Sequence, residues 1–147
     1  MSKLLSFSAN PINKDFGLLC IRLIIGLLMA FYGYEKFIHF NEMAASDFWA
    51  NNVSFLGMKG ATPLALTIFA ELFCSVFLIL GLFTRFSLLV LCFCMGYIFM
   101  VIFPGSILES GENGYKFNDA FVYFVIYLGL LFTGPGKYSF DSKIFKK

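Results

Sequence analysis

The sequence has little charge: only 14% of its 147 residues are Asp, Glu, Lys or Arg, while 59% are hydrophobic and 20% are aromatic. A soluble domain of this size carries about 25% charged and about 45–50% apolar residues. A chain this short also has too small an interior to bury so much apolar surface. The composition therefore excludes soluble enzymes and disordered chains, and it predicts a small integral membrane protein.

The residues that build metal and disulfide sites are also scarce. The one histidine, His39, is far in sequence from all four cysteines, so no zinc-type spacing occurs. The cysteines fall inside apolar runs, where a thiol is inert, and we expect them to serve in packing. No pair of haem-ligating histidines and no flavin or iron–sulfur motif is present. We therefore expect no metal site and no built-in cofactor, and no catalytic residue can be named. The net charge of +2 is too small to indicate a nucleic-acid partner.

What the chain does contain is four long apolar runs, and about 20 mostly apolar residues are enough for a helix to cross a bilayer. Proline and glycine mark the ends of these runs, since proline starts a helix well and cannot continue one. Only Thr84-Arg85 separates the second run from the third, which predicts a tight antiparallel hairpin. We predict an all-α membrane protein, a four-transmembrane-helix up-down bundle forming a single integral membrane domain over residues 1–147. Its spans cover about residues 16–34, 61–83, 86–103 and 117–133.

The Lys and Arg residues are unequally divided between the two sides of this bundle. Four spans put both termini on one side, and positive residues gather on the cytoplasmic side of membrane proteins. We therefore expect both termini in the cytoplasm, in a bacterial cytoplasmic (inner) membrane. The terminal side holds Lys3, Lys14, Arg85, Lys137, Lys143, Lys146 and Lys147, and the other side holds Lys36, Lys59 and Lys116 with Glu35, Glu42, Asp47, Glu109 and Glu112.

The first outer loop, residues 35–60, is the one long connection. Apolar residues recur in it at roughly helical spacing from Phe37 to Phe48, with Glu42 and Asp47 between them. This pattern predicts a short interfacial amphipathic helix, with Trp49 at its end as an aromatic anchor.

Arg22 and Glu71 are ionisable residues inside predicted spans, where such residues are costly and usually face the bundle interior. Arg22 shares a helix face with Gly26, Ala30 and Gly33, whose small side chains permit close packing. A buried Arg22–Glu71 pair is one hypothesis, although the rise per residue puts the two backbones about 6 Å apart in depth. In the alternatives, Arg22 extends to the cytoplasmic interface, and Glu71 is a protonated packing residue.

Several tyrosines lie at a predicted depth where they could form hydrogen bonds with Glu71. Tyr97 and Tyr127 fall near the membrane midplane at the depth of Glu71, and Tyr123 lies one turn outward of Tyr127. A buried tyrosine hydroxyl needs a hydrogen-bond partner, which a carboxyl group supplies. The sequence thus suggests a polar cluster of Glu71, Tyr97 and Tyr127, although tyrosines in so aromatic a protein also simply fill space. Tyr32, Lys36 and His39 suggest the mouth of a site for a lipid-soluble ligand with a polar head, or an ordinary interfacial belt.

Several short motifs together resemble the DoxX family of small four-helix membrane proteins, over about residues 16–141. Each motif is weak alone, but their order and spacing are fairly specific. The motifs are Arg22 with Gly26, Tyr32-Gly33-Tyr34-Glu35-Lys36-Phe37, Ala70-Glu71, Leu80-Gly81-Leu82-Phe83-Thr84-Arg85, and Gly134-Pro135-Gly136-Lys137-Tyr138-Ser139-Phe140-Asp141.

The resemblance implies a four-helix bundle and a link to redox complexes. The family's name comes from a subunit associated with a quinone-linked thiosulfate oxidoreductase, and other members are tied to thiol and oxidative-stress complexes. Among the matched positions, Arg22, Lys36 and Glu71 are functional candidates. Arg85 fits a cytoplasmic turn, and Ser139 and Asp141 are expected to fix the chain after the last helix.

Three functions are compatible with these observations. The first is an accessory subunit of a membrane redox complex that binds a quinone and contacts a membrane or soluble redox partner protein. The second is a carrier of a small solute or proton that uses Arg22 and Glu71. The third is a non-catalytic structural or assembly protein in the lipid bilayer, and a homo-oligomer is compatible with each. The candidate ligand-binding residues are Arg22, Lys36, Glu71, Tyr97, Tyr123 and Tyr127.

Overall fold

A computed structural model of the chain describes residues 13–104, 107–111 and 114–145. In this part of the chain, three helices are long and apolar enough to cross a membrane: Lys14–Ile38, Ala61–Leu80 and Thr84–Ile102. A further apolar helix, α6 (Asp119–Thr133), has 15 residues and is therefore about 22 Å long. The prediction of a helical membrane protein is confirmed to the extent of the three long spans.

Two of the long helices change their winding along their length. The helix from Ala61 to Leu80 consists of α3 (Ala61–Ile68), the π-helical segment η2 (Phe69–Cys74) and α4 (Ser75–Leu80). The next helix, α5 (Thr84–Tyr97), likewise continues into the π-helical segment η3 (Ile98–Ile102). Such π-helical turns are rare and often occur at functional sites, because they shift the side chains that follow onto another face.

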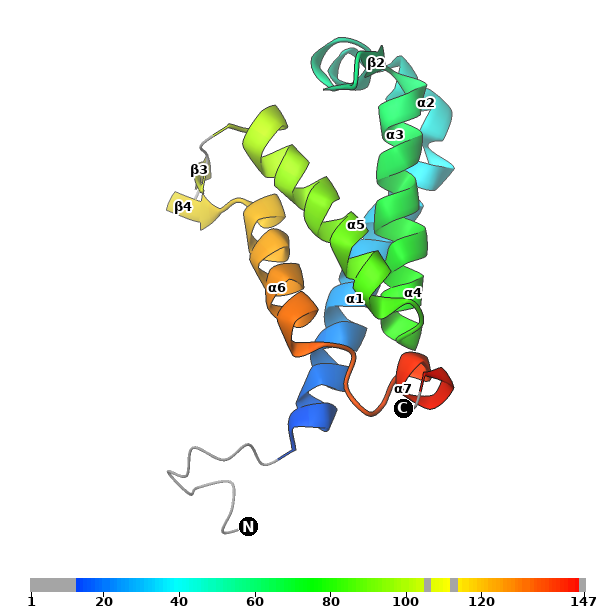
Figure 1. Cartoon of the computed structure of the whole chain (residues 1–147). Coiled ribbons are helices and arrows are strands. Elements are labelled where there is room, and N and C mark those ends of the chain that lie inside the picture. The colour runs from blue at the N-terminus through cyan, green and yellow to red at the C-terminus, as the bar shows by residue number, and fades with distance from the viewer. Residues whose placement is uncertain (1–12, 105–106, 112–113, 146–147) are drawn as a thin grey trace.

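The connections divide between two ends of the molecule (Figure 1). One end, which we call the terminal end, holds the start of α1 (Lys14–Ile38), the turn between α4 and α5, and the short α7 (Phe140–Ile144). The opposite end, the loop end, holds the remaining short elements. These are α2 (Phe40–Ala45), η1 (Phe48–Asn52), the hairpin of β1 (Ser54–Phe55) and β2 (Met58–Lys59), and the hairpin of β3 (Leu108–Gly111) and β4 (Gly114–Phe117).

The predicted interfacial helix is only partly present. A helix does form in the first outer loop, but α2 has only six residues. The connections also contain two short antiparallel hairpins, β1–β2 and β3–β4, which the hydropathy pattern did not indicate. The prediction that Trp49 is a membrane anchor is wrong. Its side chain is only 6% exposed and packs with Val53, Leu64 and Ile68 inside the protein, because α2 and η1 fold back against α3.

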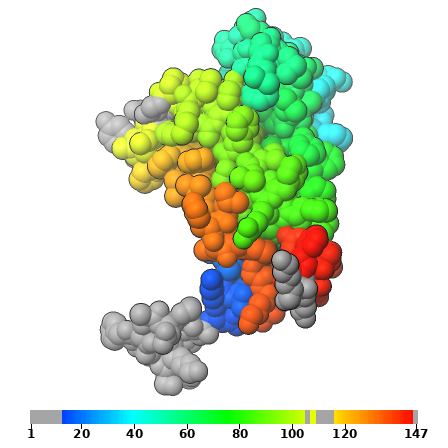
Figure 2. All heavy atoms as spheres, viewed as in Figure 1, coloured from blue at the N-terminus to red at the C-terminus, as the bar shows by residue number. Residues whose placement is uncertain are grey.

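The outer surface of the helices is apolar, unlike that of a soluble protein. Large apolar side chains such as Phe31, Phe93 and Phe132 point outward, 62–83% exposed, as expected for residues that face lipid. The main core lies among the helices and includes Met29, Leu91 and Tyr127. On the face seen in Figure 2, the side chains of α5 and α6 meet without a break, in agreement with their extensive packing.

Candidate functional site

The most unusual polar contact inside the helices is an ion pair between Lys36 of α1 and Glu71 of η2. The Lys36 ammonium group donates a hydrogen bond to Glu71 Oε2. The Glu71 side chain is 3% exposed and the Lys36 side chain 19% exposed. A carboxylate this deeply buried in an apolar bundle needs such a partner.

The packing of α1 against η2 brings the two residues together. The buried positions of α1 are Leu18, Arg22, Gly26, Met29 and Gly33, and helical spacing puts Lys36 next on the same face. Gly33 allows the helices to approach closely, since a Cβ atom there would lie 2.5 Å from Leu72 N and 2.8 Å from the Glu71 carbonyl carbon. This close approach sets Glu71 beside Lys36, one helical turn further along α1.

A methyl group at Gly33 should therefore disturb the site. We expect Gly33→Ala to lower the free energy of unfolding by about 1–3 kcal/mol, because the clash is with main-chain atoms that can move only if the helices separate. Denaturation in detergent micelles would measure this loss. The control is Gly129→Ala, since a Cβ at Gly129 of α6 has no atom within 4 Å. Equal stability of both variants would contradict the proposed packing.

The ion pair borders a cavity of about 220 Å³ between α1, α5 and α6. Its walls are mainly apolar side chains, and its polar groups converge from three elements. Lys36 and Tyr32 come from α1, Glu71 comes from η2, and Asp119 and Tyr123 come from α6. A mostly apolar cavity with a few converging polar groups is typical of small-molecule sites. We call this cavity the Lys36–Glu71 pocket.

A second, polar hollow of about 470 Å³ adjoins this pocket at the loop end. Tyr32 and Lys36 line both spaces, and the hollow is completed by Glu35, His39, Glu42 and Met43. His39 Nδ1 lies 3.2 Å from Glu42 Oε2, and both side chains are exposed. Lys36 thus stands between the buried carboxylate of Glu71 and a polar surface.

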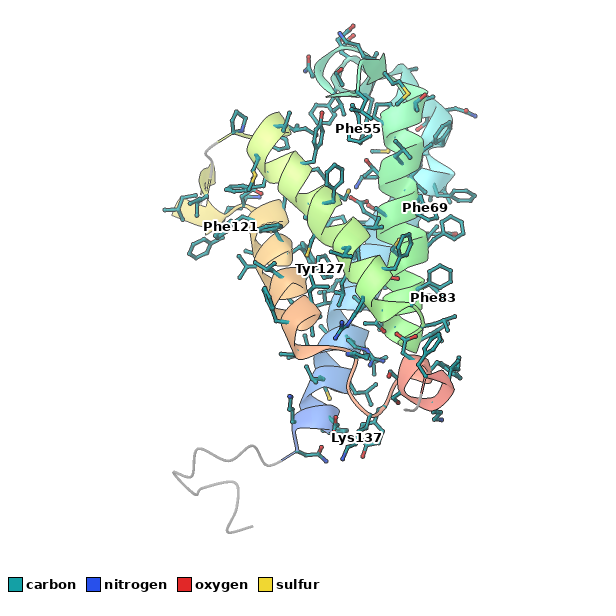
Figure 3. All side chains as sticks on the ribbon, in the orientation of Figure 1. Phe55, Phe69, Phe83, Phe121, Tyr127 and Lys137 are labelled. Atoms are coloured by element: carbon teal, nitrogen blue, oxygen red, sulfur yellow. The ribbon has the colours of Figure 1, made fainter. Side chains whose placement is uncertain are left out.

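Three tyrosines form a ladder from the pocket into the core. The Tyr32 and Tyr123 rings meet edge to face at 6.3 Å, and the Tyr123 and Tyr127 rings stack at 6.1 Å. Tyr127 lies fully buried between α6 and the other helices (Figure 3). Its buried hydroxyl has no hydrogen-bond partner among the described residues. The structure therefore places Tyr123 in the pocket wall and Tyr127 beneath it.

Arg22 is not part of this site, and the hypothesis of a direct Arg22–Glu71 pair is wrong. The Arg22 side chain is 1% exposed and donates to four main-chain carbonyl oxygens near the terminal end. Its Nε bonds Leu78 O at 3.2 Å, its Nη2 bonds Tyr138 O at 3.2 Å and Ile79 O at 3.4 Å, and its Nη1 bonds Pro135 O. The guanidinium thus joins the last turn of α4 to the chain that follows α6.

Ser139 and Asp141 complete this junction. Ser139 Oγ accepts from Ser142 N at the start of α7. The Asp141 carboxylate accepts from Phe83 N at 2.8 Å and Thr84 N at 2.7 Å, which caps α5. Figure 3 shows Phe83 and Lys137 at this end of the molecule.

Tyr97 also lies apart from Glu71, so the cluster of Glu71, Tyr97 and Tyr127 does not form. The Tyr97 hydroxyl donates to Ser54 O of the β1–β2 hairpin, and its ring meets Phe55 edge to face at 5.4 Å. It lines a separate, nearly apolar cavity of about 260 Å³ between α3, η2 and α5.

Several residues that line the pocket did not stand out in the sequence as site residues, among them Asp119 and Met29. Asp119 had a usable signal, because it lies near the start of the fourth predicted span, on the side of the membrane where Lys36 follows the end of the first. Met29 had a weaker signal, since it continues the stripe from Arg22 to Gly33. In the described residues, no group of three or more His, Cys, Asp or Glu side chains is placed to hold a metal ion.

The pocket therefore offers one strong hydrogen-bond donor, Lys36, and two carboxylate acceptors, Glu71 and Asp119, in apolar surroundings. This set suits a neutral polar head group that both accepts and donates hydrogen bonds.

Comparisons with known proteins agree with this membrane architecture. An uncharacterized protein from Haemophilus influenzae is 27% identical over 140 residues, which cover 91% of this chain and 95% of that protein. No solved structure matches this chain. Residues 17–103, which contain Arg22, Lys36 and Glu71, match the DoxX family. This match covers more than half of the chain, and the protein therefore belongs to the DoxX family.

Proposed function

We propose that this protein binds a quinone-type ligand in the Lys36–Glu71 pocket, as an accessory subunit of a membrane redox complex. The observation that carries the proposal is the buried ion pair at the wall of a mainly apolar cavity. A quinone carbonyl oxygen can accept a hydrogen bond from Lys36, and a quinol hydroxyl can donate one to Glu71 or Asp119. Apolar walls suit the ring of such a ligand.

The proposal includes four membrane crossings with both termini in the cytoplasm. Three crossings are the long helices, and α6 with its flanking loops would be the fourth. Lys14, Arg85, Lys137 and Lys143 at the terminal end support this orientation. Lys3, Lys146, Lys147 and Glu112, which belong to the same predicted charge distribution, lie outside the described residues.

Quinone binding by the purified protein in lipid nanodiscs tests the proposal. We expect Asp119→Asn and the double variant Lys36→Met/Glu71→Leu to weaken binding by about tenfold, or about 1.4 kcal/mol. The double variant removes both charges together and so leaves no unpaired buried ion. Arg85→Gln is the matched control, since Arg85 is exposed at the terminal end and lines no part of the pocket.

Two results would contradict the proposal. One is a wild-type protein that binds neither benzoquinones nor naphthoquinones. The other is equal binding by the wild type, Asp119→Asn and the double variant. If these variants instead lost only their association with other membrane proteins, a structural or assembly role would be favoured.

A further inference from the structure

Helices α1 and α6 are joined at one end and separate at the other. At the terminal end, Lys137 N donates to Asp15 Oδ1 at 3.0 Å, and Arg22 donates to Pro135 O. Along its length α6 packs against α5 and η3, and no comparable packing of α6 against α1 occurs among the described residues. Figure 1 shows the ribbons of α1 and α6 diverging toward the loop end. The two helices therefore form a V that opens away from the terminal end.

The Lys36–Glu71 pocket lies in the open part of this V. Met29, Tyr32 and Lys36 line it from one arm, and Ala120 and Tyr123 line it from the other. Side chains on the outer surfaces of the two arms are apolar and exposed, as Leu28 (47%), Phe31 (67%) and Val122 (38%) show. Because these neighbours face lipid, an opening between the arms faces lipid as well.

One aromatic contact spans the opening. The Tyr32 ring, 47% exposed, meets the partly buried Tyr123 ring edge to face at 6.3 Å. An edge-to-face pair contributes only about 0.5–1.5 kcal/mol beyond its area. The exposed Tyr32 ring can therefore move away from Tyr123, while Tyr123 stays stacked on the buried Tyr127.

We infer that the gap between α1 and α6 is a lateral portal, closed by Tyr32 and Tyr123, through which a ligand with a long alkyl or isoprenoid tail reaches the pocket from the bilayer. The pocket volume supports this ligand class. At about 220 Å³ the cavity is smaller than the about 300–1,000 Å³ usual for drug-sized ligands. A cavity of this size holds the head group of the ligand and leaves the tail outside, in the lipid that the portal faces. The identity of the head group as a quinone rests on the proposed function, whereas the portal does not.

Quenching by brominated lipid tests the portal without any quinone. Trp49 is replaced by phenylalanine, and single tryptophans are introduced as Tyr123→Trp and, for a lipid-facing reference, Phe31→Trp. The wild-type protein, whose only tryptophan is the buried Trp49, is the buried reference. In nanodiscs of lipid brominated at mid-chain, we expect Tyr123→Trp to be quenched nearly as strongly as Phe31→Trp. Quenching as weak as that of Trp49 would overturn the portal.

The same samples reveal whether a second copy of the chain fills the V instead. In that case Tyr123→Trp would be weakly quenched and the protein would be dimeric in the nanodisc, which also overturns the inference.

A reversible cross-link tests access. Cysteines are placed as Tyr32→Cys with Tyr123→Cys in a variant without the four native cysteines. A short bis-thiosulfonate joins them, because each cysteine thiolate forms a disulfide with the reagent and displaces a sulfinate, and dithiothreitol reduces these disulfides again. We expect the association rate of a long-tailed quinone to fall by at least about tenfold and to recover after reduction. The control pair is Phe99→Cys with Phe121→Cys, which joins η3 to α6 where the rings lie 5.1 Å apart and leaves the portal open.

The outcomes separate the inference from the proposed function. An unchanged rate in the cross-linked Tyr32/Tyr123 variant would overturn the portal as the access route while quinone binding remained. Absence of quinone binding by the wild type would overturn the proposed function, and lipid quenching would still decide whether the portal exists.

Discussion

Replacing Lys36 with methionine is expected to destabilise the protein by about 3–5 kcal/mol, because it leaves the Glu71 carboxylate buried without a partner. The Glu71 side chain is 3% exposed and cannot turn to water. Denaturation of the purified protein in mixed micelles, followed by circular dichroism, measures the loss.

The double variant Lys36→Met/Glu71→Leu tests whether the cost comes from the unpaired charge. Replacing both members of a buried ion pair with apolar residues of similar volume is often neutral or stabilising. We therefore expect the double variant to recover most of the stability that Lys36→Met loses. Lys143→Met is the surface control, because Lys143 of α7 is exposed. An equally unstable double variant would show that packing by Lys36, and not charge compensation, supports the site.

Replacing Arg22 with methionine is expected to cost at least about 3 kcal/mol, because four main-chain carbonyl oxygens lose a charged donor at once. The guanidinium is closely enclosed, since a Cβ at Gly81 would lie 2.6 Å from Arg22 Nη2. Methionine matches the length of the side chain approximately but has no donor. The same denaturation assay measures the loss.

Arg22→Lys separates charge from geometry in this junction. Lysine keeps the charge but cannot present the planar set of donors that reaches four oxygens. We therefore expect Arg22→Lys to recover only a small part of the free energy of unfolding that Arg22→Met loses. Arg85→Met is the control for loss of an arginine at the same end of the molecule, since Arg85 is exposed. Stability equal to the wild type in Arg22→Met would contradict the structural role assigned to Arg22.

The environment of Arg22 argues against the second function, a carrier of a small solute or proton that uses Arg22 and Glu71. A carrier would need Arg22 along the path of the solute, but the N–H groups of its side chain are bonded to carbonyl oxygens at the junction of α4 with the chain after α6. The structure thus separates the two ionisable residues that the sequence joined in one hypothesis.

The membrane class, the inward face of the first helix and the family could be predicted from the sequence, because they depend on composition and local spacing. The long apolar runs determined the helical membrane class, since a lipid environment leaves few other ways to satisfy the backbone. The stripe of Arg22, Gly26 and Gly33 correctly marked the inward face of the first helix, because helical periodicity is a local property. The motifs also pointed to the DoxX family, which the family match confirms.

The partners of the buried charges were decided only by the tertiary structure. The sequence suggested a pair of Glu71 with Arg22 because both are ionisable residues inside predicted spans, although their predicted depths differ by about 6 Å. In the structure, α1 continues to Ile38 and carries Lys36 along its buried face, and Gly33 lets η2 approach closely enough for Glu71 to reach it. Arg22 is satisfied by carbonyl oxygens, which every residue has and no side-chain pattern reveals. Sequence alone determined that Arg22 and Glu71 face the interior, whereas the close packing of α1, η2 and the chain after α6 decided which groups they meet.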